Sequence, residues 1–115
     1  MTAPRDDRVF LAHIRDALSR VESYVHGVSE AEFRRQPILQ DAVIRQVQIA
    51  GEAARHLSPA FLEAHPEVPW SAIIGMRHKL VHDYFRVSLD RVWVAATSEV
   101  PPLNAKIQRM LDAHA

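Results

Sequence analysis

The stretch DRVFLAHIRDALSRVESYVH, residues 7–26, decides the fold class. Its apolar side chains recur at spacings of three and four, as one face of an α-helix requires. They are Val9, Phe10, Ile14, Ala17, Leu18, Val21, Tyr24 and Val25. Gly27 follows where a left-handed C-terminal cap belongs. The pattern predicts an amphipathic helix over about residues 7–26.

Further helix signals follow this first segment. Ser29 with Glu32 three residues later is typical of a capping box and predicts a short helix through Arg34. Pro37 then precedes a long helical pattern over roughly residues 38–57. Its apolar side is formed by Val43, Val47, Ala50, Ala54 and Leu57.

The second half of the chain continues in the same way. Ser58-Pro59 predicts an N-cap with proline at the first helical position, and this short helix should end before His65. Pro69-Trp70 opens another helix, and a last one begins near Ser88. Pro101-Pro102 should kink or break that last helix because each proline lacks a backbone donor.

The length of 115 residues predicts a single small domain. No window alternates polar and apolar residues as a strand would. We therefore expect an all-α, antiparallel bundle of four to five main helices that occupies residues 1–115 as one domain.

The same composition excludes several classes of protein. Cysteine is absent, no run approaches the ~18 apolar residues needed to cross a bilayer, and the N-terminus does not resemble a signal peptide. The prediction is a cytoplasmic protein with no membrane contact. Formal net charge is zero, with 14 basic and 14 acidic residues, so any contact with RNA should be local.

Residues 77–84, RHKLVHDY, concentrate the groups that can carry chemistry. On an ideal helix Arg77 and His82 lie about 140° apart, so they cannot simply point at one spot. Either the helix end distorts or a second copy of the chain completes the site. Gly75, just upstream, allows a ligand or a partner backbone to approach closely, although a close helix crossing would also explain it.

The residues alone leave three interpretations of this segment open. It could be a solvated helix end whose bases favour the helix dipole. It could be a metal site, with His78 and His82 at i, i+4 and Asp83 or Glu52 as a third ligand. It could also cleave RNA without a metal, because RNA supplies its own 2′-hydroxyl nucleophile and needs only a histidine and an arginine in one cleft.

The pattern Arg77-x-x-x-x-His82-x-Tyr84 resembles the signature of HEPN-domain ribonuclease toxins of the HepT branch. The stretch PEVPWSAIIGMR, residues 66–77, is similar to the family's approach to its catalytic helix, and residues 49–54 and 92–103 also match its pattern. The resemblance covers about residues 8–111 and favours metal-free RNA cleavage.

The resemblance implies a homodimer whose two motif helices form a shared RNA-cleaving cleft. It also implies a partner, a minimal nucleotidyltransferase antitoxin that transfers AMP from ATP onto the motif tyrosine, here Tyr84. An AMP on Tyr84 would block RNA by sterics and like-charge repulsion. No cofactor and no metal are implied.

These considerations assign a role to each candidate residue. We expect His82 to be the general acid or base, Arg77 to bind the phosphate and transition state, and Tyr84 to be the switch. His78 and Asp83 would support them. Glu52 is either a hydrogen-bond partner of the motif arginine or histidine or a surface charge.

A rival hypothesis remains, namely a non-catalytic helical module that binds substrate or nucleotide for a nucleotidyltransferase. Trp70 and Trp93 are expected in the core or a dimer interface rather than as base-stacking platforms. The remaining histidines look like scattered surface residues without a role; they are His13, His26, His56, His65 and His114.

Overall fold

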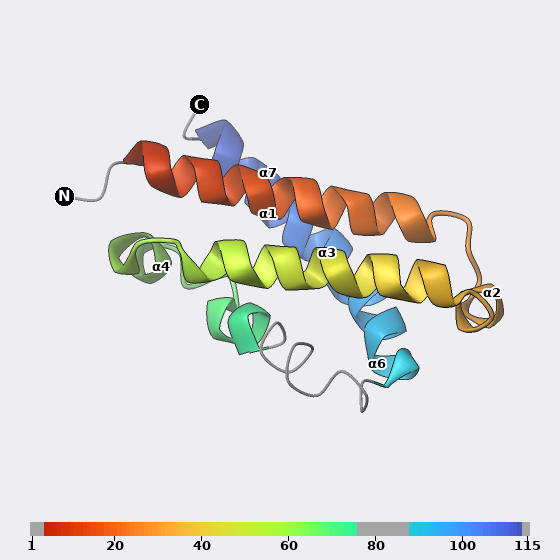
Figure 1. The fold of residues 1–115 in the computed structure, drawn as a ribbon. Coiled ribbons are helices and arrows are strands. Elements are labelled where there is room, and N and C mark those ends of the chain that lie inside the picture. The colour runs from red at the N-terminus through yellow and green to blue at the C-terminus, as the bar shows by residue number, and fades with distance from the viewer. Residues whose placement is uncertain (1–3, 76–87, 114–115) are drawn as a thin grey trace.

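The structure is a computed structural model that describes residues 4–75 and 88–113 (Figure 1). Within these ranges every regular element is helical, which confirms the all-α class. The elements are α1 (Pro4–Val25), α2 (Glu30–Arg34), α3 (Pro37–Arg55), α4 (Pro59–Ala64), a helical stretch over residues 70–75, α6 (Leu89–Val94), the π-helical segment η2 (Ala95–Glu99) and α7 (Val100–Ala113).

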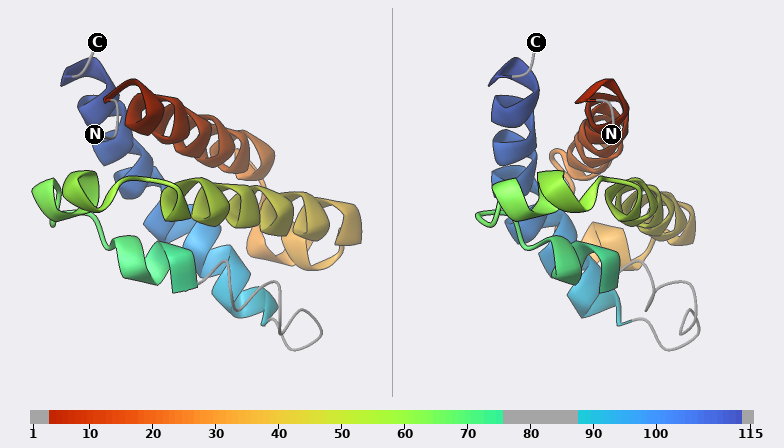
Figure 2. Two further views of the ribbon diagram at one scale, coloured as in Figure 1. Left: turned by 60° about the vertical axis from the view of Figure 1, so that its left-hand side comes forward. Right: turned by 90° about the vertical axis from the view of Figure 1, so that its left-hand side faces the viewer.

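Two long helices, α1 and α3, lie side by side and run antiparallel (Figure 1). The path of α6, η2 and α7 runs at an angle to them, and α7 packs against α1 (Figure 2). The periodic positions form the common core, as predicted. Fully or almost fully buried members include Ile14, Val21, Val43, Ala54 and Ile107. Leu11, which the predicted stripe omits, is also fully buried. Val9 is the exception to the predicted stripe, because its side chain is 45% exposed.

Local capping signals end and begin the helices where the sequence predicts. Gly27 adopts a φ of 71°, the left-handed conformation in which glycine avoids a steric penalty. Ser29 Oγ accepts from the N–H of Glu32 at 3.1 Å, and the Glu32 carboxylate accepts from the N–H of Ser29 at 3.0 Å. This second bond holds the pKa of Glu32 below its ordinary value of 4.5.

A buried polar contact joins the start of α1 to the start of α4. Ser58 caps α4 by accepting from the N–H of Phe61. The Asp7 carboxylate, only 7% exposed, accepts from the Ser58 N–H at 2.8 Å and from the Ser58 hydroxyl at 2.7 Å. The cap residue is therefore itself held by a charge-assisted pair of hydrogen bonds across 51 positions of sequence.

The predicted break at Pro101-Pro102 takes the form of a widened turn. Both prolines lie in the first turn of α7, and the five residues before it are π-helical. An α-helix would place the carbonyls of Thr97 and Ser98 against the two proline rings and would need N–H groups that proline lacks. The π-helical segment absorbs this conflict, so the chain stays helical instead of ending.

None of the described helices combines the length and the apolar character needed to span a membrane.

Candidate functional site

Five of the predicted site residues lie outside the described ranges. They are Arg77, His78, His82, Asp83 and Tyr84. The described part of the site consists of the two segments that flank residues 76–87, together with Glu52 on α3 and its surroundings.

The segment that leads into the motif is anchored by Trp70. Its indole is 7% exposed, and Nε1 donates to the backbone carbonyl of His65 at 2.9 Å. The ring meets Phe61 edge-on, with centroids 6.1 Å apart. Val68 is buried beside it, and Lys106 Nζ from α7 donates to the carbonyl of Glu67 at 3.1 Å. The predicted core role of Trp70 is confirmed, and the turn before the motif is tied to α7.

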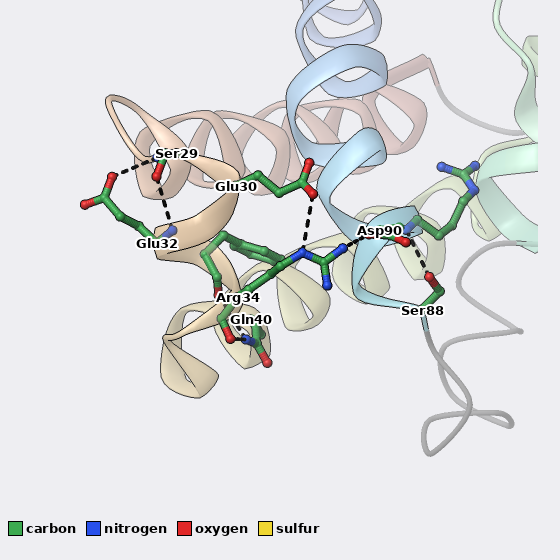
Figure 3. A network of polar contacts seen from close by, with 9 residues as sticks. Ser29, Glu30, Glu32, Arg34, Gln40, Ser88 and Asp90 are labelled. Carbon is green, nitrogen blue, oxygen red and sulfur yellow. Dashed lines mark hydrogen bonds and ion pairs between the residues drawn. The ribbon is translucent and has the colours of Figure 1, made fainter.

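The segment that leaves the motif is held by polar contacts to α2 (Figure 3). Ser88 caps α6 by accepting from the N–H of Arg91 at 3.4 Å. Asp90, in the first turn of α6, forms an ion pair with Arg34 of α2, which also bonds Glu30 at 3.3 Å. Opposite charges near this helix start therefore fix α6 against α2.

An aromatic contact supports the same corner. Trp93 of α6 packs on the fully buried Phe33 of α2, with ring centroids 5.2 Å apart. Trp93 is thus a core-flanking aromatic, as predicted. Both segments that flank residues 76–87 start from elements anchored to the bundle.

Gly75 does not lie at a close helix crossing within the described ranges. It is exposed, and a Cβ built there would meet no described atom within 4 Å. The alternative interpretation, a ligand or a partner backbone next to Gly75, stays a prediction.

Glu52 lies on α3 with its side chain 37% exposed. Its Oε2 atom accepts from Arg55 Nη2 at 3.0 Å and lies 3.0 Å from His56 Nε2. The carboxylate is therefore engaged by two basic neighbours one turn further along its own helix. The predicted contact with Arg77 or His82 involves residues outside the described ranges.

A groove opens between α1 and α3 around Glu52. Its volume is about 460 Å³, and its lining comprises Phe10, His13, Arg45, Gln48, Ile49, Glu52, Ala53 and His56. His56 stacks on Phe10 with centroids 5.1 Å apart and an interplanar angle of 18°. His13 meets the same ring edge-on at 6.0 Å.

The sequence alone does not predict this cluster. By their spacing His13 and His56 look like scattered surface residues, but the structure brings both to Phe10. The signal was present in the spacing, because positions 45, 48, 49, 52, 53 and 56 form one stripe on a helix. Only the packing of α1 against that stripe reveals the groove.

A second, apolar cavity of about 300 Å³ lies between α3, residues 69–73 and η2. The ion pair of Arg91 with Glu99, 3.1 Å apart, lines it and spans the π-helical segment.

Within residues 4–75 and 88–113, no three histidine or carboxylate side chains gather closely enough to hold a metal ion. The alternative of a metal at His78 and His82 lies outside these ranges.

The chain is similar to known proteins over most of its length. The model of the family described as "Ribonuclease HepT-like" matches residues 14–110. A protein of Caldanaerobacter subterraneus subsp. tengcongensis named "Putative RNase" is 36% identical over 104 residues, which is 90% of this chain and 93% of that protein. A protein of Thermococcus cleftensis named "Probable ribonuclease HepT" is 31% identical over 106 residues, or 92% and 96% of the two chains. No solved structure matches the chain significantly.

Proposed function

Because the chain belongs to the ribonuclease HepT-like family, we propose that it is a metal-independent endoribonuclease, the toxin of a toxin–antitoxin pair. Arg77 and His82 carry the cleavage in this proposal, and His78, Asp83 and Glu52 support them. Tyr84 is the site at which a cognate nucleotidyltransferase silences the enzyme.

One observation carries the proposal. The Arg77-x-x-x-x-His82-x-Tyr84 pattern lies inside the region that the family model matches, residues 14–110. The two relatives named as RNases align over at least nine-tenths of both chains, so their names refer to proteins of the same extent as this one.

The chemistry needs few groups. The 2′-oxygen of the RNA attacks the adjacent phosphorus and gives up its proton to a base, while the bond to the 5′-oxygen breaks and that oxygen takes a proton. His82 carries one of these proton transfers, and the Arg77 guanidinium stabilises the charge on the phosphorane oxygens. The products are a 2′,3′-cyclic phosphate and a 5′-hydroxyl.

A homodimer follows from the angular problem at the motif. Arg77 and His82 lie about 140° apart on an ideal helix, so one chain does not aim both at one phosphate. A second copy can supply the missing group across an isologous interface. Exposed Gly75, with no described atom near its Cβ position, supports a close approach there.

Regulation uses the tyrosine. Its hydroxyl oxygen attacks the α-phosphorus of ATP, loses its proton and releases pyrophosphate, leaving AMP on Tyr84. The attached phosphate can pair with Arg77 and withdraw it from RNA.

The test is a cleavage assay on purified protein with a labelled RNA in excess EDTA. His82→Ala and Arg77→Ala should each reduce the cleavage rate by at least about 100-fold. His26→Ala, which removes an exposed histidine at the end of α1, should cleave like wild type. Loss of wild-type cleavage in EDTA with recovery on added zinc or manganese would replace the proposal with the His78–His82 metal site.

The partner is tested by coexpression with the cognate nucleotidyltransferase. The mass of the chain should rise by one or more AMP units, and growth arrest should disappear. Tyr84→Phe should still cleave RNA and should escape silencing. Complete neutralisation of Tyr84→Phe would show that inhibition works by binding alone.

A further inference from the structure

We propose that the groove between α1 and α3 binds a short stretch of an RNA strand, with one base on the Phe10–His56 stack and a phosphate further along the strand at Arg45. This inference rests on the proposed ribonuclease function, which is the reason for RNA to be near the groove. Among the described residues, the groove is lined by residues of α1 and of α3 with its C-terminal cap residue His56.

The groove has the size and composition of a ligand site. A volume of about 460 Å³ lies within the ~300–1,000 Å³ range of small-molecule sites. The floor contains the buried Ala53 and the half-buried Ile49. Most of the remaining lining is polar or aromatic, so the groove combines a planar apolar surface with hydrogen-bonding groups.

The aromatic pair offers a stacking platform. His56 lies nearly parallel to Phe10, at an interplanar angle of 18°, and its side chain is 49% exposed. Every nucleobase has a π-face, so stacking on such a platform tolerates any sequence. His13 packs edge-on against Phe10 and helps to hold that ring in place.

Arg45 supplies the phosphate contact. It is exposed and, among the described residues, its guanidinium takes part in no ion pair or hydrogen bond. The planar guanidinium matches phosphate geometry with two parallel N–H donors. Arg45 lies two helical turns from Glu52 on the same face of α3.

The carboxylate in the groove does not oppose this assignment. Glu52 forms an ion pair with Arg55 at 3.0 Å, and His56 Nε2 lies 3.0 Å from the same oxygen, so the guanidinium offsets the charge of the carboxylate. The Gln48 side-chain amide adds one acceptor and one donor group for a base edge.

Other occupants fit less well. A partner helix needs a row of exposed apolar anchors, but the large hydrophobic side chains exposed within the described ranges are Val9, Ile38 and Val94, and none lines the groove. An anionic lipid surface needs a cluster of about four to eight bases, and among the described lining residues Arg45 is the only arginine.

The test measures binding of a fluorescein-labelled, fully 2′-O-methylated 12-nucleotide RNA to the full chain by fluorescence anisotropy. Methylation removes the nucleophile, so binding is separated from cleavage. His56→Ala should weaken binding roughly 5-fold to 100-fold through lost stacking. Arg45→Gln should weaken it and lower the slope of log affinity against log salt by about 1.

The matched control is Arg20→Gln, which removes an exposed arginine of α1 outside the groove. It should bind RNA like wild type. Circular dichroism and thermal melting verify that each variant is folded. Affinities of His56→Ala and Arg45→Gln equal to that of folded wild type would overturn the proposal.

A second arm distinguishes RNA from free nucleotide. ATP and AMP are titrated into ¹⁵N-labelled protein, and the amide signals of residues 10–13 and 45–56 are followed. Saturation by ATP at lower concentration than by RNA would overturn the assignment to an RNA strand.

The failure of this inference is separable from failure of the proposed function. His82→Ala should not cleave unmodified RNA but should retain binding of the methylated RNA that Arg45→Gln weakens further. Arg45→Gln should raise KM and leave the single-turnover rate at saturating RNA unchanged. If the wild-type protein binds RNA in the groove but does not cleave it, only the ribonuclease proposal is contradicted. If it cleaves RNA with a KM that Arg45→Gln does not change, only the groove proposal is contradicted.

Discussion

Helices α1 and α3 each have one face in the apolar core and another face that lines the groove. On one, Ile14 and Val21 of α1 meet Val43 and Ala54 of α3 in a core that excludes solvent. On the other, His13 and Arg45, with their polar neighbours, line an open groove. A rotation of about 100° per residue separates core from groove within a single turn of each helix.

This difference separates stability from recognition. The core face stabilises the folded state by burying apolar surface, and this stabilisation is roughly proportional to the area removed from water. The groove face leaves its polar groups partly hydrated, so they contribute little to folding and remain available to a ligand. Substitutions on the two faces should therefore change different measurements.

The largest effect is expected from the core face. Ile14→Ala should lower the free energy of unfolding by about 2–5 kcal/mol because it leaves a cavity at a fully buried position. Urea denaturation measures the loss. Val9→Ala on the same helix, at a 45% exposed position, is the control and should change stability by no more than about 0.5 kcal/mol. Equal losses for both would show that α1 is packed differently.

The next largest loss of stability is expected from a polar residue that is buried. Asp7→Ala leaves the Ser58 N–H without its acceptor at 2.8 Å and should cost roughly 1–3 kcal/mol. Thermal melting should show the loss, whereas Asp6→Ala, an exposed neighbour, should melt close to wild type. An unchanged melting temperature for Asp7→Ala would contradict the buried contact.

A smaller effect is expected at the exposed cap of α2, outside the groove. Ser29→Ala removes the acceptor of the Glu32 N–H and should cost about 1 kcal/mol. Ser23→Ala, an exposed position inside α1, should not destabilise the protein. Chemical denaturation compares the two variants. Equal midpoints would show that the cap does not contribute to stability.

The same cap should make stability depend on pH. The hydrogen bond from the Ser29 N–H holds the pKa of Glu32 below 4.5 in the folded state. A depressed folded-state pKa stabilises the protein fully above 4.5, and this contribution disappears as the pH falls through the folded-state value. Glu32→Gln should thus be less stable than wild type at pH 7, with the gap closing below pH 4.5. A gap that widens on acidification would contradict this sign.

The smallest expected effect on stability comes from the groove face. Arg45→Gln should change the free energy of unfolding by no more than about 0.5 kcal/mol, because Arg45 is exposed. Its RNA affinity should fall at the same time. A large loss of stability would mean that the groove face is part of the structural framework after all.

Most of the described fold could be predicted because its signals are local. The capping box of Ser29 and Glu32, the left-handed Gly27 and the proline after Ser58 all act within four residues, so spacing alone reveals them. The motif from Arg77 to Tyr84 was identified by its resemblance to a family, and the family is confirmed by the match over residues 14–110.

Contacts between distant positions could not be predicted. Asp7 and Ser58 are 51 positions apart, and no local sequence pattern around either residue predicts their contact. Val9 belongs to an apolar stripe by spacing, yet its side chain is 45% exposed.

The sequence by itself determined where helices start and stop and which side of each is apolar, because capping and periodicity are properties of neighbouring residues. Only the tertiary structure decided that His13 and His56 meet at Phe10 and that Glu52 is shared by Arg55 and His56. Side chains on two helices come together only after apolar burial has set the rotation of each helix about its axis, and that rotation depends on the whole core at once.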